Sequence, residues 1–309
     1  MHNKTILLLL SASLCACVAD TADDTDSDAQ SIAVDNAANA KKHVMPTVDH
    51  IRRAEIGAVV DNGNGIQYHG GSVMTSTHNV AFFIWYGNWS NNTAPAILTN
   101  FMKHLPGSPY FNINSTYTNR AGTAITNSVK FGGSINDNYS HGTTLDDNAV
   151  QAIVSDAVTG GKLPRSANGI YFVLTSSDVT ESSGFCSQYC GWHYYGAIAG
   201  TRLKYAFIGN PDQCPTSCAV QTTSPNDNAG ADGMASIIAH ELEETVTDPY
   251  VSAWYDASGE ENGDKCAWTF GTESSAANGS QYNITLNGMN YLIQQNWVDA
   301  NGGSCAMSF

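Results

Sequence analysis

A histidine and two glutamates stand at helix spacing near residue 240, and their types suit metal-assisted catalysis. Residues 239–245 read Ala-His-Glu-Leu-Glu-Glu-Thr. On a helix, His240 and Glu244 share one face because they are four residues apart, so both could bind one metal ion. Glu241 would lie about 100° round the helix from His240, at the position of the general base in an H-E-x-x-H metalloprotease helix. A bound metal would lower the pKa of its water toward ~7, and Glu241 would shuttle the proton.

The motif is a variant, because a glutamate stands where a zincin helix has its second histidine. A third ligand could come from the loop at 254–264, with Glu261 or Asp264 as the candidates. One imidazole with two carboxylates suits Zn²⁺ with an open water position. An all-oxygen set would suit Ca²⁺ instead, and its members are Asp256, Glu260, Glu261 and Asp264. The sequence leaves the choice of metal open.

The same residues have a plainer interpretation. A His-Glu-x-x-Glu string arises by chance, and an acidic helix face is commonly just solvated. Two features favour a metal site: the acids flank an apolar stripe of Met234, Ile238 and Leu242, and a second acidic cluster follows shortly after.

The helix that carries the motif should run from about 232 to 247, because Pro249 cannot continue it and biases Asp248 away from helical geometry. The hydrophobic patterns predict strands over 80–86, 169–174 and 204–208, helices over 94–105 and 145–158, and strands with Asn/Gly turns over 282–309. A Cys-rich loop lies between the second and third strands. We predict a single layered α/β or α+β domain, stapled by disulfides, with a mixed sheet and a central zincin-like helix.

The N-terminus is typical of export. Residues 1–19 have a basic start, an apolar stretch and small residues, which predicts a signal peptide. Residues 14–17 also resemble a lipobox, in which Cys17 would carry a lipid anchor. Residues 20–44 form an acidic leader that we expect to be disordered, and 45–309 form the domain. No later segment reaches the ~18 consecutive apolar residues of a membrane span. The protein is therefore secreted, or tethered to the cell envelope as a lipoprotein.

The domain contains an even number of cysteines, which in an exported chain predicts three disulfides. The pairs Cys186/Cys190 and Cys214/Cys218 could each close a local loop or cross-link to the other pair, and Cys266 with Cys305 would then tie down the last segment. The alternative is a zinc site built on four of these thiols. The net charge of −15 makes nucleic acid an unsuitable partner, because an acidic surface repels phosphates.

The chain resembles the EXORDIUM-like, or phosphate-induced, family of secreted plant proteins and their microbial relatives over most of its mature length. The matching motifs are Tyr68-His69-Gly70-Gly71, Ile84-Trp85-Tyr86-Gly87-Asn88-Trp89, Tyr171-Phe172-Val173-Leu174-Thr175-Ser176-Ser177-Asp178-Val179, Gly184-Phe185-Cys186, Cys190-Gly191, Gly233-Met234, Ala239-His240-Glu241-Leu242, Glu244-Thr245, Ala253-Trp254-Tyr255 and Asp264-Lys265-Cys266. The resemblance implies export and a shared fold. It also marks two positions adjacent to the site: His193, which could reach the helix if the Cys-rich loop folds over it, and Asp248, where plant members often carry Asn.

Two functions remain open on these grounds. The first is a degenerate zincin-like hydrolase acting on an extracellular polypeptide, with His240, Glu244 and Glu261 as ligands and Glu241 as the base. The second is a non-enzymatic binding or signalling protein, for example one that binds cell-wall polysaccharide, in which the carboxylates hold a structural Ca²⁺ or no metal. Trp85, Tyr86 and Trp89 could form a sugar-stacking face, although aromatic runs on strands are usually core. A glycosidase would need two carboxyl groups across a cleft, which spacing in a sequence does not show.

Overall fold

The computed structural model describes residues 43–51 and 65–309. The predicted signal peptide, Cys17 and the leader up to residue 42 lie outside these residues. The first described strand, β1 (His43–Pro46), begins before the predicted domain start at 45. No helix in the described ranges combines the length and the apolar character that crossing a membrane requires.

A six-stranded mixed sheet forms the centre of the domain, in the order β1-β8-β9-β6-β3-β4. Its other members are β8 (Tyr189–Ile198), β9 (Thr201–Ile208), β6 (Gly169–Thr175), β3 (Val80–Tyr86) and β4 (Lys130–Asp137). The neighbours from β9 to β4 pair in parallel, whereas β8 runs antiparallel to both β9 and β1. The predicted strands over 80–86, 169–174 and 204–208 are confirmed. β3 and β6 read as continuous apolar runs because both of their faces are buried, as expected inside a parallel sheet.

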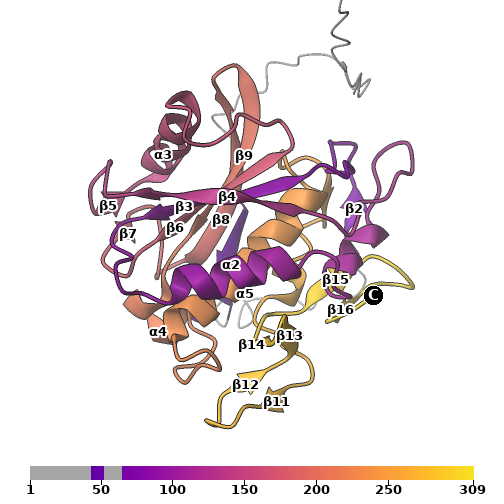
Figure 1. The fold of residues 1–309 in the computed structure, drawn as a ribbon. Helices are drawn as coiled ribbons and strands as arrows, with labels where there is room; N and C mark the ends of the chain where they lie inside the picture. Colours follow the sequence, from indigo (N-terminus) through magenta and orange to yellow (C-terminus); the bar gives the residue numbers. More distant parts are fainter. Residues whose placement is uncertain (1–42, 52–64) are drawn as a thin grey trace, which may run out of the picture. The chain divides into compact units, whose positions relative to one another are not determined.

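Helices cover both faces of this sheet. Figure 1 shows α3 (Asp147–Thr159) on one face, with α2 (Ala94–His104) and α5 (Ala229–Thr247) on the other. The Asp146 carboxylate accepts a hydrogen bond from the Ala149 amide and thereby caps α3. Asn228 caps α5 in the same way through the Ala231 amide, and α5 ends at Thr247, two residues before Pro249 as predicted. The prediction of a mixed α/β domain with a mixed sheet is confirmed.

The short elements complete the chain around this core. They are β2 (Gln67–Tyr68), η1 (Phe111–Thr116), β5 (Thr144–Leu145), β7 (Thr180–Glu181), η2 (Pro211–Gln213), α4 (Pro215–Cys218), β10 (Trp254–Tyr255), η3 (Asp264–Cys266), β11 (Ser274–Ser275), β12 (Gln281–Tyr282), β13 (Ile284–Leu286), β14 (Met289–Tyr291), β15 (Asn296–Val298) and β16 (Ser304–Ala306). The predicted tail strands are confirmed in part, since residues 292–295 leave the ladder between β14 and β15.

The Cys-rich segment predicted to be a loop is instead largely strand β8. Its hairpin with β9 turns at Ala199 and Gly200, whose φ angles are both positive (49° and 78°). That geometry is typical of a tight hairpin turn, but Ala-Gly is a weaker signal for it than Asn-Gly, so the sequence pattern missed the strand. Two disulfides, Cys186–Cys214 and Cys190–Cys218, cross-link the two Cys pairs and join the start of β8 to α4. Three disulfides are thus confirmed, and the zinc-thiolate alternative is wrong.

The third disulfide joins Cys266 of η3 to Cys305 of β16, across 39 residues. Closing a loop of this length lowers the conformational entropy of the unfolded chain. In the chain-entropy account this stabilises the folded state by about 4 kcal/mol. We therefore expect Cys266→Ala/Cys305→Ala to lower the free energy of unfolding by roughly that amount in urea denaturation. A loss below about 1 kcal/mol would show that this bond is not what holds the C-terminal strands in place.

Candidate metal centre

Helix α5 is buried on every side, and this determines the character of the site. It contacts β8 and β9 of the sheet, α2 beside it, and η1, so no face of it is left to solvent. His240, Glu241, Glu243 and Glu244 are each 0% exposed. The interpretation that the acidic face is merely solvated is therefore wrong. The expectation of an amphipathic helix is wrong as well, because the acidic face is as buried as the apolar stripe. Burying several carboxylates is costly unless each is paired or neutralised.

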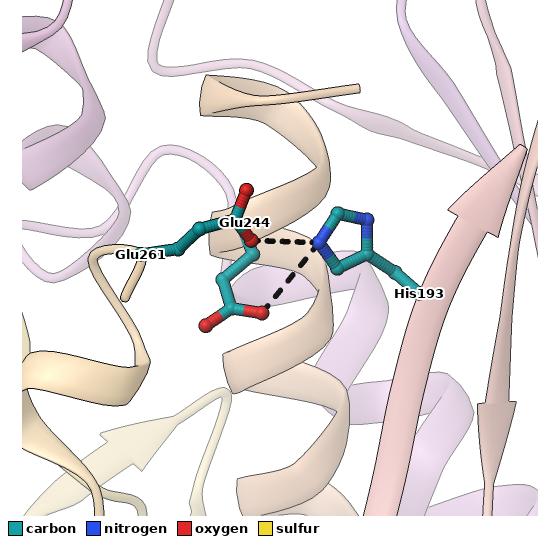
Figure 2. A group of neighbouring side chains, drawn as sticks. All are labelled: His193, Glu244 and Glu261. Carbon is teal, nitrogen blue, oxygen red and sulfur yellow. Dashed lines mark hydrogen bonds and ion pairs between the residues drawn. The ribbon is translucent and has the colours of Figure 1, made fainter. Parts of the chain in front are cut away.

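One group of potential ligands joins the helix to the sheet and to the loop after β10. Figure 2 shows the His193 imidazole of β8 facing the carboxylates of Glu244 and Glu261. His193 Nε2 lies 2.8 Å from Glu261 Oε2 and 3.6 Å from Glu244 Oε2. His193 is on a regular strand rather than on a loop folded over the helix, so the sheet itself holds its ring against α5.

A second group lies on the same helix and shares one residue with the first. His240 Nε2 lies 2.9 Å from Glu244 Oε1 and 3.5 Å from Asp264 Oδ1. The ligand atoms within each group lie within 4.8 Å of one another. Glu244 therefore turns one carboxylate oxygen toward each imidazole. The expected set of His240, Glu244 and Glu261 is divided: Asp264 lies with His240, whereas Glu261 lies with His193.

Several polar atoms at this junction have no hydrogen-bond partner within the described parts of the chain. They are His240 Nε2, Glu244 Oε2, Glu261 Oε1 and Asp248 Oδ2, of which His240 Nε2 and Glu244 Oε2 are held only at the ion-pair distances given above. His193 Nδ1 also has no partner, but it is not the ring nitrogen that faces the carboxylates. Buried polar atoms are almost always satisfied in native proteins, so a concentration of unsatisfied ones needs a cause. Imidazole nitrogens and carboxylate oxygens are ligand atoms of Zn²⁺, so the donor set fits a divalent metal.

Burial and neighbouring charges shift the pKa values of the groups in this cluster. Burial raises the pKa of Glu261 well above its usual range, and the neighbouring Glu244 and Asp248 carboxylates raise it further. Burial also raises the pKa of Asp264, with Glu244 adding to the shift. The pKa of His193 falls because of burial first and the nearby imidazoles second, which leaves it neutral and able to bind a metal. Burial acts in the same direction on His240, but Glu244 and Asp264 outweigh it and raise its pKa well above normal.

The His240 ring is held from its other side by Gln294, a residue that no sequence pattern indicates. Gln294 Nε2 lies 2.8 Å from His240 Nδ1 and donates to the Gly263 carbonyl at 3.1 Å. An imidazole that binds a metal through Nε2 carries its proton on Nδ1. The Gln294 amide would then have to present its oxygen, which has no partner among the described residues, to that proton.

Glu241, the predicted general base, lies next to these groups but belongs to neither. Its Oε1 accepts from the Met45 amide of β1 at 3.4 Å, while its Oε2 has no partner in the described chain. Burial raises the pKa of Glu241 well above its usual range, partly offset by the charge of His240. A carboxyl group with a raised pKa can give or take a proton near neutral pH.

The all-oxygen set proposed for Ca²⁺ does not converge. Asp256 accepts from the Ser258 and Glu260 amides and pairs with Lys265 Nζ at 3.0 Å, and Glu260 is an exposed residue that belongs to neither ligand group. Asp248 caps the end of α5, with its Oδ1 accepting from the Ser252 and Ala253 amides.

His43 is the second residue that the sequence reasoning missed. It lies on β1 opposite His193, and its Nδ1 is 3.4 Å from Glu261 Oε2. The predicted leader had included this position. Only the pairing of β1 with β8 brings it to the site, and no local pattern could have revealed that pairing.

The sequence of the chain is similar to that of several known proteins. The sequence profile of the phosphate-induced protein 1 conserved region matches residues 66–307. Protein EXORDIUM-like 3 of Arabidopsis thaliana is 34% identical over 272 residues, covering 75% of this chain and 80% of that protein. EXORDIUM-like 5 of the same plant is 30% identical over 275 residues, 75% of each chain. Protein PHOSPHATE-INDUCED 1 of Nicotiana tabacum is 28% identical over 219 residues, 62% of this chain and 67% of that protein. No solved structure matches.

Proposed function

The chain belongs to the EXORDIUM-like, phosphate-induced protein 1 family, and from the site it carries we propose that it is an exported metal-dependent hydrolase acting on polypeptides. The three disulfides support export, because such bonds persist in oxidising compartments. The observation that carries the metal proposal is the sharing of Glu244 between two imidazole-carboxylate groups, each of which includes potential ligand atoms without a hydrogen-bond partner in the described chain.

The two groups give the site room for two cations. His193 with Glu261 would hold one cation, His240 with Asp264 the other, and Glu244 would bridge them. Each group offers two side chains besides Glu244, which leaves room for a water to take part in binding an ion. When bound, such ions polarise a carbonyl and lower the pKa of a bound water.

The protein residues around the ligands would then position the reaction. Gln294 orients the His240 ring, and Met45 holds one oxygen of Glu241 while leaving the other without a partner in the described chain. That second oxygen is the one that could accept a proton from a nucleophilic water. Substrate would approach from the side of His43 and Asp264, whose side chains keep 12% and 13% exposure while His193, Glu244 and Glu261 keep none.

The near-complete burial of the ligands favours a second candidate. A metal enclosed between a helix, a strand and a loop can serve to hold them together, as structural sites do. In that case the protein would act by binding and the ion would contribute only to stability. The two candidates share the metal and differ in whether Glu241 matters for chemistry.

Hydrolysis of a peptide library by wild type and Glu241→Gln separates these candidates. We expect cleavage by wild type, abolished by a chelator and restored by Zn²⁺, and at least about a 100-fold lower rate in the variant because it lacks the general base. The variant should retain its metal, since Glu241 is in neither ligand group. Equal cleavage by the two proteins would contradict the role of Glu241, and metal binding without any cleavage would establish the structural candidate.

A further inference from the structure

A second site lies at the opposite edge of the sheet, outside the carboxyl ends of β3 and β4. A groove of about 620 Å³ opens there between the loop after β3, the start of α2 and the C-terminal half of β4. Its volume is in the range of small-molecule sites, which run from ~300 to 1,000 Å³. It shares no residue with the metal centre.

The groove lies at the end of the sheet where ligands bind in open α/β folds, outside the carboxyl ends of parallel strands. β3 and β4 pair in parallel, and residues at or near the carboxyl ends of both line the groove. The topological switch point itself lies between β3 and β6, where the strand order reverses, and no residue of β6 lines the groove. The support from the fold is therefore the position at the carboxyl end of β3, next to that switch point.

The loop after β3 is built to keep this crevice open. Gly87 has a φ of 100°, and a Cβ there would lie 2.0 Å from Ser176 Oγ. The Ser176 hydroxyl instead accepts from the Asn88 amide at 3.0 Å, which ties the loop to the end of β6. Only glycine fits this turn, and the residues that follow it, Asn88 and Trp89, line the groove together with β4.

The lining of the groove identifies the class of ligand. None of the described residues that line it is charged, although the chain as a whole carries −15. Trp85 and Trp89, whose ring centroids lie 5.3 Å apart with the ring planes at 71° to each other, supply the apolar floor. Exposed Ser134, Asn136 and Asn138 form the rim, and their side chains bond to no described part of the chain.

This combination matches a carbohydrate. An amide or hydroxyl side chain offers both a hydrogen-bond donor and an acceptor, as a sugar hydroxyl does. The face of a pyranose ring that carries C–H groups is apolar and packs against aromatic side chains. The uncharged lining provides no partner for a phosphate, a sulfate or a carboxylate. We propose that this groove binds a neutral oligosaccharide.

The aromatic residues singled out in the sequence thus have different roles. Tyr86 is core, with its hydroxyl donating to the Gly142 carbonyl. Trp85 and Trp89 are mostly buried, at 3% and 9% exposure, but still form the floor of the groove. β4 is also an edge strand, so an extended peptide could add to it through backbone hydrogen bonds. Such a peptide would not use the Asn and Ser side chains on which the proposal rests.

Calorimetric titration of the secreted full-length protein tests the proposal. The probes are the tetrasaccharides of β-1,4-linked glucose, xylose, mannose and N-acetylglucosamine, with tetragalacturonate as the charged control. We expect one or more neutral probes to bind with a dissociation constant of about 1 mM or tighter. Asn136→Ala and Asn138→Ala should each weaken that binding about fivefold, the effect of one lost hydrogen bond. The matched control is Asn148→Ala, an exposed position on α3, which should bind as wild type does.

Three results would overturn the proposal: no neutral tetrasaccharide binding at 10 mM, a concentration about tenfold above the expected dissociation constant; binding of tetragalacturonate alone; or equal affinity in wild type and both groove variants. Capture of an extended peptide that is unaffected by Asn136→Ala would assign the edge of β4 to a polypeptide instead. Because each readout is binding in the groove, the result does not depend on whether the metal centre is loaded or catalytic.

Discussion

Glu244→Gln should remove all bound divalent metal from the protein. Glu244 is the residue common to both ligand groups, with Oε1 toward His240 and Oε2 toward His193. An amide offers one weak oxygen ligand where a carboxylate offers two charged ones. We expect metal affinity to fall by more than the 10- to 100-fold that changes outside the ligand shell produce. Equilibrium dialysis with Zn²⁺ measures this directly.

Thermal unfolding of Glu244→Gln should differ from that of wild type in a diagnostic way. Metal at about 100 times its dissociation constant stabilises the native state by ~2.7 kcal/mol, which corresponds to roughly 5–10 °C in Tm. Chelation should therefore lower the Tm of wild type by that amount and leave the variant unchanged. Without metal, the variant should be at least as stable as wild type, because it removes one of several buried, mutually repelling carboxylates.

Glu243→Gln is the matched control. Glu243 is the preceding residue on α5 and is equally buried, but its Oε2 accepts from Asn296 at 2.8 Å and it belongs to neither group. The control should keep its metal and its response to the chelator. If both variants lose metal equally, the loss reflects damage to the helix, and Glu244 is not the bridging ligand.

Gly263→Ala is the second change with a large expected effect. Gly263 has an ordinary helical φ of −70°, so alanine is allowed by the backbone there. However, a Cβ at this position would lie 2.8 Å from Glu244 Oε1 and 2.9 Å from His240 Nδ1. The loop after β10 must then withdraw from α5 and carry Asp264 with it. We expect loss of the ion on the His240 side and a decrease of about 1–3 kcal/mol in the free energy of unfolding.

Gly65→Ala provides the comparison for this substitution. A Cβ at Gly65 meets no atom within 4 Å. Metal content and urea unfolding should therefore match those of wild type. Wild-type metal content in Gly263→Ala would show that the loop does not need to approach α5 this closely for the site to form.

The residues of the site that share a local pattern could be predicted, and the others could not. The spacing of His240 and Glu244, together with the stop at Pro249, predicts the helix and two candidate ligands from the sequence alone. Glu261 and Asp264 were found because they follow soon after in a loop held at Cys266. Their division between two groups depends on how that loop winds over the helix, which sequence spacing does not contain.

The remaining residues come from contacts between segments far apart in the chain. The sequence pattern places His193 in a loop because the hairpin between β8 and β9 lacks a strong turn signal, and only the strand directs its ring to α5. His43 arrives through the pairing of β1 with β8, and Gln294 through a segment between β14 and β15 that forms no ladder. The expected solvated face of α5 also failed for a tertiary reason, since the C-terminal segments cover it.

The most direct test of the metal centre is metal content by mass spectrometry on the purified protein after repletion with Zn²⁺, beside His193→Ala and His240→Ala. The two-group geometry predicts two ions per wild-type chain and one in each histidine variant, because each substitution removes the imidazole of one group. A single ion lost in both variants would reduce the site to one shared centre. No bound metal in wild type would contradict the proposal that this buried cluster is a metal site.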